Sequence, residues 1–184
     1  TDLLRDLGER HGFEVAAVPE LTWYRHPISS TRIREAIHSG RLDRARRMLG
    51  RPYRVCGHVI HGKGIGSRRL HCPTANLADP MILLPPSGVY AARSFLYSDE
   101  ADPSPRPLRG VVYIGSAPTF GQDERGALPP SLELHLLDFH EDIYGARIEV
   151  EFEEFLRGEQ SFATESELEE QIHRDIARAN DRLL

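Results

Sequence analysis

Cysteines are few and long apolar runs are missing in this sequence, and each of these facts excludes a class of protein. The 184 residues include only two cysteines, Cys56 and Cys72, too few for a disulfide framework or a four-cysteine zinc site. No apolar run approaches the roughly 18 to 20 residues that span a bilayer, and the first residues lack the apolar stretch of a secretory signal. We therefore expect neither a membrane protein nor an exported one, and a reducing cytoplasm suits this composition.

The residues that are present suffice for one main folded unit with appendages. Hydrophobic residues make up 40% of the chain and charged residues 28%, a mixture that can bury one core and stay in solution. The net charge of -5 is unevenly spread, because residues 25–54 carry nine arginines against two acids. This segment has few interleaved aromatics and no known nucleic-acid motif, so we favour a solvated or domain-facing helical surface and keep RNA binding as a minor alternative.

The first fifty residues predict a strand and two short helices. A candidate strand covers residues 13–18, and the hydroxyl residues at 29–31 can cap a helix that Gly40 would end. Residues 42–49 show a second helical pattern, which ends at Gly50. These elements cannot form a large core alone.

After Pro52 the sequence changes to short β-like runs separated by glycine, proline and charged turns. The last run alternates, with Ile148, Val150 and Phe152 on one face and glutamates on the other, as in a half-buried strand. Segments 99–107 and 121–130 have the composition of surface loops. The spacing of the runs predicts a compact barrel. The runs cover residues 55–60, 89–97, 110–114, 132–137 and 148–155.

The C-terminal segment has the pattern of an amphipathic helix over about residues 164–184. Thr164 and Glu167 have the spacing of a capping box. An apolar stripe follows at helical spacing, and we expect it to lie on the barrel. The stripe consists of Leu168, Ile172, Ile176, Ala179 and Leu183.

The glycine-rich segment GKGIGSRRLHCPTAN, residues 62–76, is the most informative part of the chain. Its glycines let the backbone wrap closely around a ligand, and exposed N–H groups can cradle phosphate oxygens. It matches neither a Walker A loop nor a dinucleotide fingerprint. Glycine richness alone fits a plain turn equally well, and Lys63, the only lysine in the chain, fits a solvated side chain as well as a phosphate ligand.

Two polar residues follow the glycines at a spacing that suits a metal ion. Thr74 and Asn76 lie on the same side of an extended chain, where their oxygens could be neutral ligands to Mg²⁺ while nucleotide phosphates supply negative charge. The alternative is the start of a strand in which both side chains satisfy local backbone groups. The spacing alone favours this alternative.

Taken together, this segment and the motifs after it resemble the kinase module of bacterial bifunctional riboflavin kinase/FAD synthetase, over about residues 51–184. Residues 28–34, ISSTRIR, resemble the closing motif of the same family's FMN adenylyltransferase domain. The adenylyltransferase's earlier nucleotide motif is not in the sequence, so we do not expect FAD synthesis by this chain alone. The kinase motifs occur in order as LPPSGVYA at 84–91, IGSAPTFG at 114–121, LELHLLDF at 132–139, DIYG at 142–145 and VEF at 150–152.

The resemblance implies a mainly β fold, a small antiparallel, Greek-key-like β-barrel at about residues 51–157 with a C-terminal α-helix at about 164–184. Residues 1–50 would be an α/β remnant of the Rossmann-like nucleotidyltransferase domain. The implied activity is transfer of the ATP γ-phosphoryl group to the 5′-hydroxyl of riboflavin, giving FMN and ADP with Mg²⁺. The rival hypothesis is a non-catalytic module that binds flavin nucleotide and docks on an adenylyltransferase through residues 32–54.

The resemblance also assigns roles to residues. Glu133 would be the catalytic base, although a lone glutamate in an alternating strand is more often solvated. Thr74 and Asn76 would coordinate Mg²⁺, and riboflavin would bind near the barrel end and the C-terminal helix. His71 and Cys72 stand where the family has a glycine and an aromatic, which changes the expected pocket wall. The expected nucleotide-binding residues are Gly62, Lys63, Gly64, Gly66, Ser67, Pro73, Thr74 and Asn76.

Overall fold

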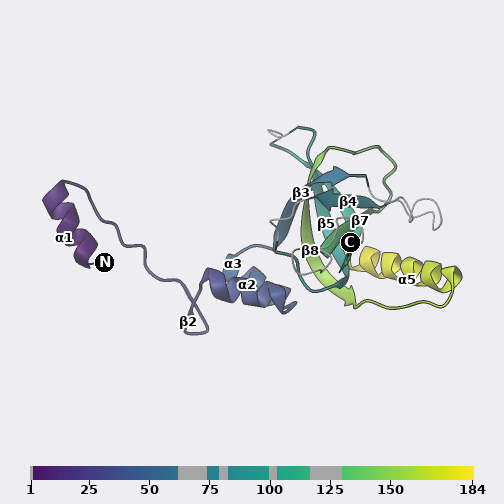
Figure 1. Ribbon diagram of the computed structural model, residues 1–184, viewed down its shortest axis with the longest axis horizontal. Coiled ribbons are helices and arrows are strands. Elements are labelled where there is room, and N and C mark those ends of the chain that lie inside the picture. Colours follow the sequence, from purple (N-terminus) through teal and green to yellow (C-terminus); the bar gives the residue numbers. More distant parts are fainter. Residues whose placement is uncertain (1, 62–73, 79–82, 100–102, 117–129) are drawn as a thin grey trace.

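Six antiparallel strands close into a barrel that begins after Pro52 (Figure 1). The computed structural model describes residues 2–61, 74–78, 83–99, 103–116 and 130–184. The strands follow one another around the barrel in the order β3-β4-β7-β6-β5-β8. β5, β6 and β7 form a meander and β8 returns beside β5, which is the Greek-key arrangement and confirms the expected fold class. Their bounds are β3 Arg54–Ile60, β4 Ala75–Ala78, β5 Gly88–Leu96, β6 Arg106–Ser116, β7 Pro130–Leu136 and β8 Arg147–Arg157.

The barrel interior holds the main core, and the alternation predicted for the last strand is confirmed there. Ile148, Val150 and Phe152 of β8 are buried inside with apolar residues from the other five strands. The glutamates between them lie on the outer face, where Glu151 pairs with Arg54 of β3 at 2.5 Å. Because side chains alternate along every strand, residues flanking an interior position face outward.

Two strands differ from the sequence prediction. β4 was expected only as an extended stretch, because it is four residues long and contributes a single large apolar side chain, Leu77. β6 starts at Arg106, inside the predicted surface loop 99–107, because the long strand β5 gives it a partner down to Leu96. Most of the other predicted loop, 121–130, lies outside the described residues.

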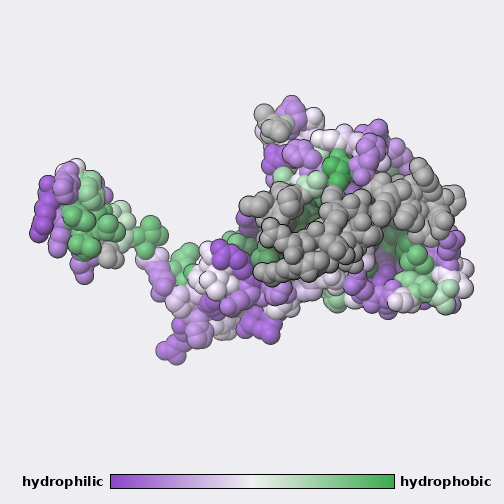
Figure 2. All heavy atoms as spheres, in the orientation of Figure 1, coloured by the Kyte–Doolittle hydropathy of each residue, from purple (hydrophilic) through white to green (hydrophobic). Residues whose placement is uncertain are grey.

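The predicted strand at residues 13–18 is wrong. Residues 13–21 have no regular structure and run between helix α1, Asp2–His11, and a hairpin of β1, Thr22–Trp23, and β2, His26–Pro27. The described structure places no strand beside 13–18, and a strand without a partner leaves its backbone groups unpaired. α1 stands apart from the barrel in Figure 1 and shows an apolar face in Figure 2.

The two predicted short helices are confirmed as α2, Ser30–His38, and α3, Leu42–Leu49. The Ser29 hydroxyl caps α2 by accepting a hydrogen bond from the Arg32 backbone N–H at 3.3 Å. Gly50 ends α3 in the left-handed conformation, with φ 72°. The helices bury a small core of their own, which also contacts Tyr53 and Leu83 at the edge of the barrel.

Helix α5, Glu165–Leu183, packs on the barrel through its C-terminal end, and its first turns extend away from the barrel (Figure 1). The Thr164 hydroxyl caps it by accepting from the Glu167 N–H, which confirms one half of the predicted capping box. The Glu167 carboxylate accepts from the Ala163 N–H, one residue before the N–H expected in a capping box. Ala179 and Leu183 of the predicted stripe are buried on β5 and β6. Among the described residues, no helix has the length and apolar character needed to cross a membrane.

Candidate functional site

A row of outward-facing side chains crosses neighbouring strands on one side of the barrel. Asn76 of β4 pairs directly with Glu133 of β7, and Glu133 pairs directly with Tyr113 of β6. Directly paired residues of antiparallel strands project from the same face. Leu132 and Leu134, on either side of Glu133, are buried in the barrel core, so the row lies on the outer face.

Glu133 is held in a partly dry environment beside a hydroxyl group. Burial raises the pKa of its carboxyl above the usual value, and a hydrogen bond from the Thr74 hydroxyl partly opposes this by stabilising the carboxylate. Thr74 immediately precedes β4 and lies two residues from Asn76. A carboxylate with a raised pKa accepts protons more readily than a solvated one, which is the property of a general base.

A pocket of about 690 Å³ lies between this face of the barrel and α5. Its barrel wall includes Glu133, His135 and Tyr113. Its helix wall includes Leu168 and Ile172, the start of the apolar stripe. The pocket therefore offers one apolar side and one side with polar groups, within the usual size range for a small-molecule site. The remaining lining residues are Thr74, Val89, Val111, Arg157, Glu159, Gln160, Ser161, Phe162, Asp175 and Ile176.

A buried ion pair closes one side of this larger pocket. Arg157, the last residue of β8, pairs with Asp175 of α5 at 2.8 Å, and Gln171 donates a further hydrogen bond to the Asp175 carboxylate at 2.9 Å. The Arg157 and Asp175 side chains are 16% and 8% exposed. This pair fixes α5 to the end of β8, and so sets the distance between the two walls of the pocket.

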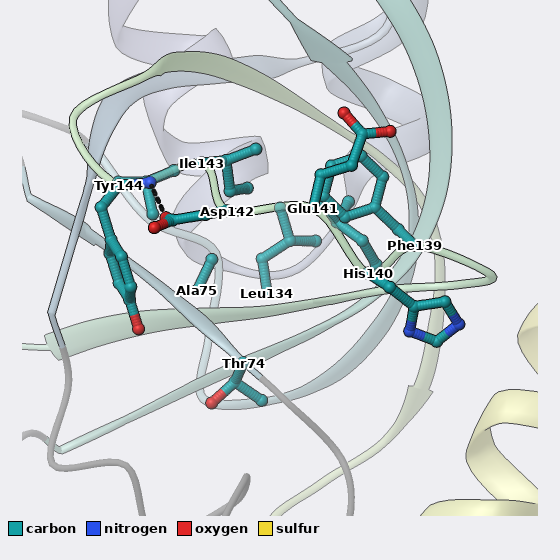
Figure 3. A pocket seen from close by; sticks show the side chains of 11 residues that line it. Thr74, Ala75, Leu134, Phe139, His140, Glu141, Asp142, Ile143 and Tyr144 are labelled. Atoms are coloured by element: carbon teal, nitrogen blue, oxygen red, sulfur yellow. Dashed lines mark hydrogen bonds between the residues drawn. The ribbon is translucent and has the colours of Figure 1, made fainter.

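A second, smaller hollow of about 340 Å³ opens at the end of the barrel (Figure 3). Ala75, Leu134 and Phe139 give it an apolar lining, and Tyr144 and His140 lie on opposite sides of it in Figure 3. The Tyr144 backbone N–H donates to the Asp142 carboxylate at 3.0 Å, which holds the rim in a tight turn. The other lining residues are Val59, Leu136, Glu141, Ile143 and Thr74.

Aromatic groups extend the rim of the smaller hollow toward the glycine-rich segment. The His61 ring stacks on the Tyr144 ring with centroids 3.5 Å apart. His61 is the last described residue before that segment. A flat heteroaromatic ligand entering the hollow would therefore meet an apolar lining and a stacked pair at its edge.

Thr74 is the residue that the two hollows share, since it lines both. The structure thus brings together Thr74 and Glu133 as hydrogen-bond partners, with Asn76 beside them by strand register. Asn76 is not among the described residues that line either hollow. The predicted residues Gly62, Lys63, Gly64, Gly66, Ser67 and Pro73 lie outside the described residues, as do His71 and Cys72.

The oxygen atoms around Glu133 suit a metal ion that enters together with a phosphate ligand better than a metal ion that the protein holds by itself. Thr74 and Asn76 offer two neutral oxygens on one face, next to one carboxylate. Across the described part of the chain, no cluster of three histidine, cysteine or acidic side chains could hold an ion by itself. Mg²⁺ accepts few protein ligands when phosphate oxygens complete its coordination, so these residues fit that ion.

Sequence reasoning missed Tyr113, Glu159 and the Arg157–Asp175 pair. Tyr113 and Glu159 are separated by 46 residues and meet only through the fold. Asp175 did carry a signal, because it is an acid beside Ile172 and Ile176 in the apolar stripe and therefore needs a cationic partner.

The family model and the relatives that match this sequence all point to one family. The family model for riboflavin kinase (Flavokinase) matches residues 49–183. A bifunctional riboflavin kinase/FMN adenylyltransferase of Pseudomonas fluorescens is 38% identical over 178 residues, covering 97% of this chain and 53% of that protein. The Bacillus subtilis protein of the same description is 38% identical over 163 residues, covering 88% and 48%. The chain spans about half the length of these relatives.

Solved structures agree on the fold. A crystal structure described as a macrolide-efflux protein from Streptococcus pneumoniae matches with a TM-score of 0.75 and 29% identity, over 96% of this chain and 54% of that one. Riboflavin kinase from Trypanosoma brucei matches with a TM-score of 0.53 and 23% identity, over 72% of this chain and 80% of that one. The second likeness supports the barrel and its helix.

Proposed function

The chain belongs to the riboflavin kinase family, and we propose that it transfers the γ-phosphoryl group of ATP to the 5′-hydroxyl of riboflavin, giving FMN and ADP. The observation that carries the proposal is the position of Glu133, a carboxylate with a raised pKa that bonds to Thr74 where two hollows adjoin. Phosphoryl transfer needs this arrangement, because the donor and the acceptor must be bound side by side with a base at the acceptor oxygen.

We assign riboflavin to the larger pocket. Its apolar wall on α5 suits the flat ring system, and its polar wall reaches Glu133, where the ribityl chain would present its hydroxyl. ATP would then occupy the smaller hollow, with its base against the apolar lining and the Tyr144 ring. The acids Glu141 and Asp142 disfavour phosphates there, so the phosphates would extend toward Thr74.

In the reaction, Glu133 accepts the proton of the 5′-hydroxyl while that oxygen forms its bond to the γ-phosphorus. The bond between the γ-phosphorus and the bridging oxygen breaks at the same phosphorus, and ADP leaves with the electron pair. The hydrogen bond from Thr74 orients the Glu133 carboxylate. Thr74 and Asn76 would hold Mg²⁺, which neutralises charge on the phosphates when it is bound.

Two further assignments follow from the sequence resemblance. The loop from Gly62 to Ser67, with Pro73, would cover the phosphates through backbone N–H groups. Residues 1–50 would be the C-terminal part of an FMN adenylyltransferase domain, a reading supported by the bifunctional relatives. The adenylyltransferase would then be the partner of the barrel, and we assign this chain no FAD synthesis of its own.

Chromatographic assay of FMN formation from riboflavin and ATP, with FAD monitored in the same run, tests the function. We expect FMN without FAD, and loss of FMN when Mg²⁺ is chelated. Glu133→Gln should lower kcat by about 100-fold or more, because a general base contributes 10²- to 10⁴-fold, while riboflavin affinity changes little. Glu153→Gln is the matched control, since Glu153 is a strand glutamate on the outer face that bonds to Arg93 and lies outside both hollows.

Two outcomes would contradict the proposal in different ways. Unchanged FMN formation by the Glu133→Gln variant would remove the base assignment. Riboflavin or FMN binding by the unmodified chain, without turnover in the presence of ATP and Mg²⁺, would favour the non-catalytic binding module instead.

A further inference from the structure

The segment between β8 and α5, residues 158–163, forms a strap along the edge of the larger pocket. Glu159, Gln160, Ser161 and Phe162 of the strap all line that pocket. Most of the strap is exposed, and Phe162 is half-buried against the pocket. The strap therefore gains little from core packing, and its position depends on specific contacts.

Several contacts hold the two ends of the strap to the elements from which it comes. At its start, Arg157 donates to the Gly158 carbonyl at 3.0 Å and is itself fixed by Asp175. At its end, the Ala163 N–H donates to Glu167 at 3.0 Å in the first turn of α5. The Arg157 guanidinium also lies over the Phe162 ring, with Cζ 5.8 Å from the ring centroid. All of these contacts stay within β8, the strap and α5, so none of them joins the strap to the barrel strand β6.

Tyr113 supplies a contact from the barrel wall to the strap, one residue after the strap begins. Its hydroxyl donates to the Glu159 carboxylate at 2.7 Å, which joins β6 to the strap. Tyr113 is also the direct strand partner of Glu133. The same side chain thus borders the proposed base and reaches the strap.

The strand leaves room for this orientation of the Tyr113 ring. Gly115 lies two residues later on the same face of the strand and has no side chain. A Cβ added at Gly115 would overlap the Tyr113 ring, because it would lie 2.6 Å from Cε1 of that ring. The ring therefore passes over Gly115 to reach Glu159. Burial and the neighbouring Glu159 carboxylate raise the pKa of Tyr113 to about 12, so the hydroxyl keeps its proton and remains a donor at neutral pH.

From this geometry we propose that Tyr113 is a positioning residue which holds the strap across the larger pocket through Glu159, and so sets how tightly riboflavin is enclosed. The proposal rests on the proposed function for the identity of the ligand. The geometry also gives different roles to the three carboxylates that line the pocket. Asp175 pairs with Arg157, Glu159 accepts from Tyr113, and Glu133 is left to the acceptor hydroxyl. The bond should therefore affect riboflavin binding more than the chemical step.

A double-mutant cycle in the full chain tests the proposal. Tyr113→Phe, Glu159→Ala and the double variant are compared by riboflavin binding, followed as quenching of flavin fluorescence, and by kcat and KM for FMN formation. We expect Tyr113→Phe to weaken riboflavin binding and raise its KM by about 3- to 10-fold, the effect of losing one charge-assisted hydrogen bond at a partly exposed site. We expect kcat to stay within about twofold, and the double variant to be no weaker than the weaker single variant.

Amide hydrogen exchange of residues 158–163 in the ligand-free chain tests the same bond without any ligand. Exchange should be faster in the Tyr113→Phe and Glu159→Ala variants. Tyr53→Phe is the matched control, because the Tyr53 hydroxyl also donates a hydrogen bond, to the Leu83 carbonyl at 2.6 Å, but does not line the pocket. It should change neither the exchange of the strap nor riboflavin binding.

Strap exchange that is the same in all variants would overturn the proposal, as would independent, additive effects of the two substitutions on riboflavin affinity. A fall in kcat with unchanged KM would also overturn it, because it would place Tyr113 in the chemical step. If the unmodified chain bound no riboflavin, the proposed function would fail, and the exchange cycle would still decide whether Tyr113 holds the strap.

Discussion

The Arg157–Asp175 pair predicts a large loss of stability when only one partner is removed. Asp175 receives hydrogen bonds from Arg157 Nε at 3.1 and 2.8 Å and from Gln171 at 2.9 Å. In Asp175→Ala these donors lose their acceptor. The Arg157 guanidinium, whose side chain is 16% exposed, then keeps its charge in a largely dry place. Breaking a buried pair in this way costs about 3 to 5 kcal/mol.

The expected loss lies at the lower end of that range. Arg157 retains its bond to the Gly158 carbonyl and a cation–π contact with the Phe162 ring, whose centroid lies 5.8 Å from the guanidinium carbon. Its partial exposure also lets water reach the charge. We therefore expect Asp175→Ala to lower the free energy of unfolding by about 3 kcal/mol. For a chain of this size, that corresponds to a fall in Tm of roughly 6 to 12 °C.

Urea unfolding followed by far-UV circular dichroism measures the effect. Glu170→Ala is the matched control on the same helix, because the Glu170–Arg174 pair is well exposed and such pairs contribute at most about 0.5 kcal/mol. Removing both charges in Arg157→Met/Asp175→Ala should recover at least half of the loss, because no unpaired charge then remains. A loss below about 1 kcal/mol in Asp175→Ala, or strict additivity in the double variant, would refute the reasoning.

Two further predictions concern the pocket. Because Glu133 acts as a base only when ionised and its pKa is raised, kcat/KM should fall as the pH drops through a value above the ordinary carboxyl range, and a pH profile whose acid limb lies at or below about 4.3 would contradict this. Gly115→Ala should displace the Tyr113 ring and weaken riboflavin binding at least as much as Tyr113→Phe does, and fluorescence titration should show little further loss when Gly115→Ala is added to Tyr113→Ala.

The barrel could be predicted largely because its strands are half-buried. A strand with one face in a core must alternate, and Ile148, Val150 and Phe152 carry that signal in the sequence. β4 lacks the signal, since it is short and has only Leu77 to bury. The order in which strands close the barrel depends on long-range pairing, which local patterns do not encode.

The strand predicted at residues 13–18 is wrong for the same reason, because a strand depends on a pairing partner that local patterns do not encode. Phe13, Val15 and Val18 belong to residue types that favour strands, but β propensity describes how a side chain fits a paired, packed surface. This segment has no neighbouring strand in the described structure, and Val18 is exposed. Propensity without a partner therefore gave a wrong prediction.

Sequence motifs identified individual residues of the site, but the contacts between these residues depend on the fold. Thr74 and Glu133 were expected from their motifs, and their hydrogen bond depends on the pairing of β4 with β7. Tyr113 was not expected, because an aromatic in a strand usually packs in a core. Its role depends on Gly115 and on Glu159, which comes from a segment far along the chain.

The apolar stripe of α5 shows how one sequence pattern serves both folding and the pocket. The helical spacing predicts that the whole stripe lies on the barrel, yet only Ala179 and Leu183 are buried there. Leu168, Ile172 and Ile176 remain half-exposed, because the larger pocket lies between them and the strands. When a ligand covers apolar helix surface that is not buried in the protein core, burying that surface contributes about 25 cal/mol of favourable free energy per Å². The unfilled part of the stripe is therefore the part of α5 available for binding, and the Arg157–Asp175 pair keeps it open by holding the helix at the end of β8.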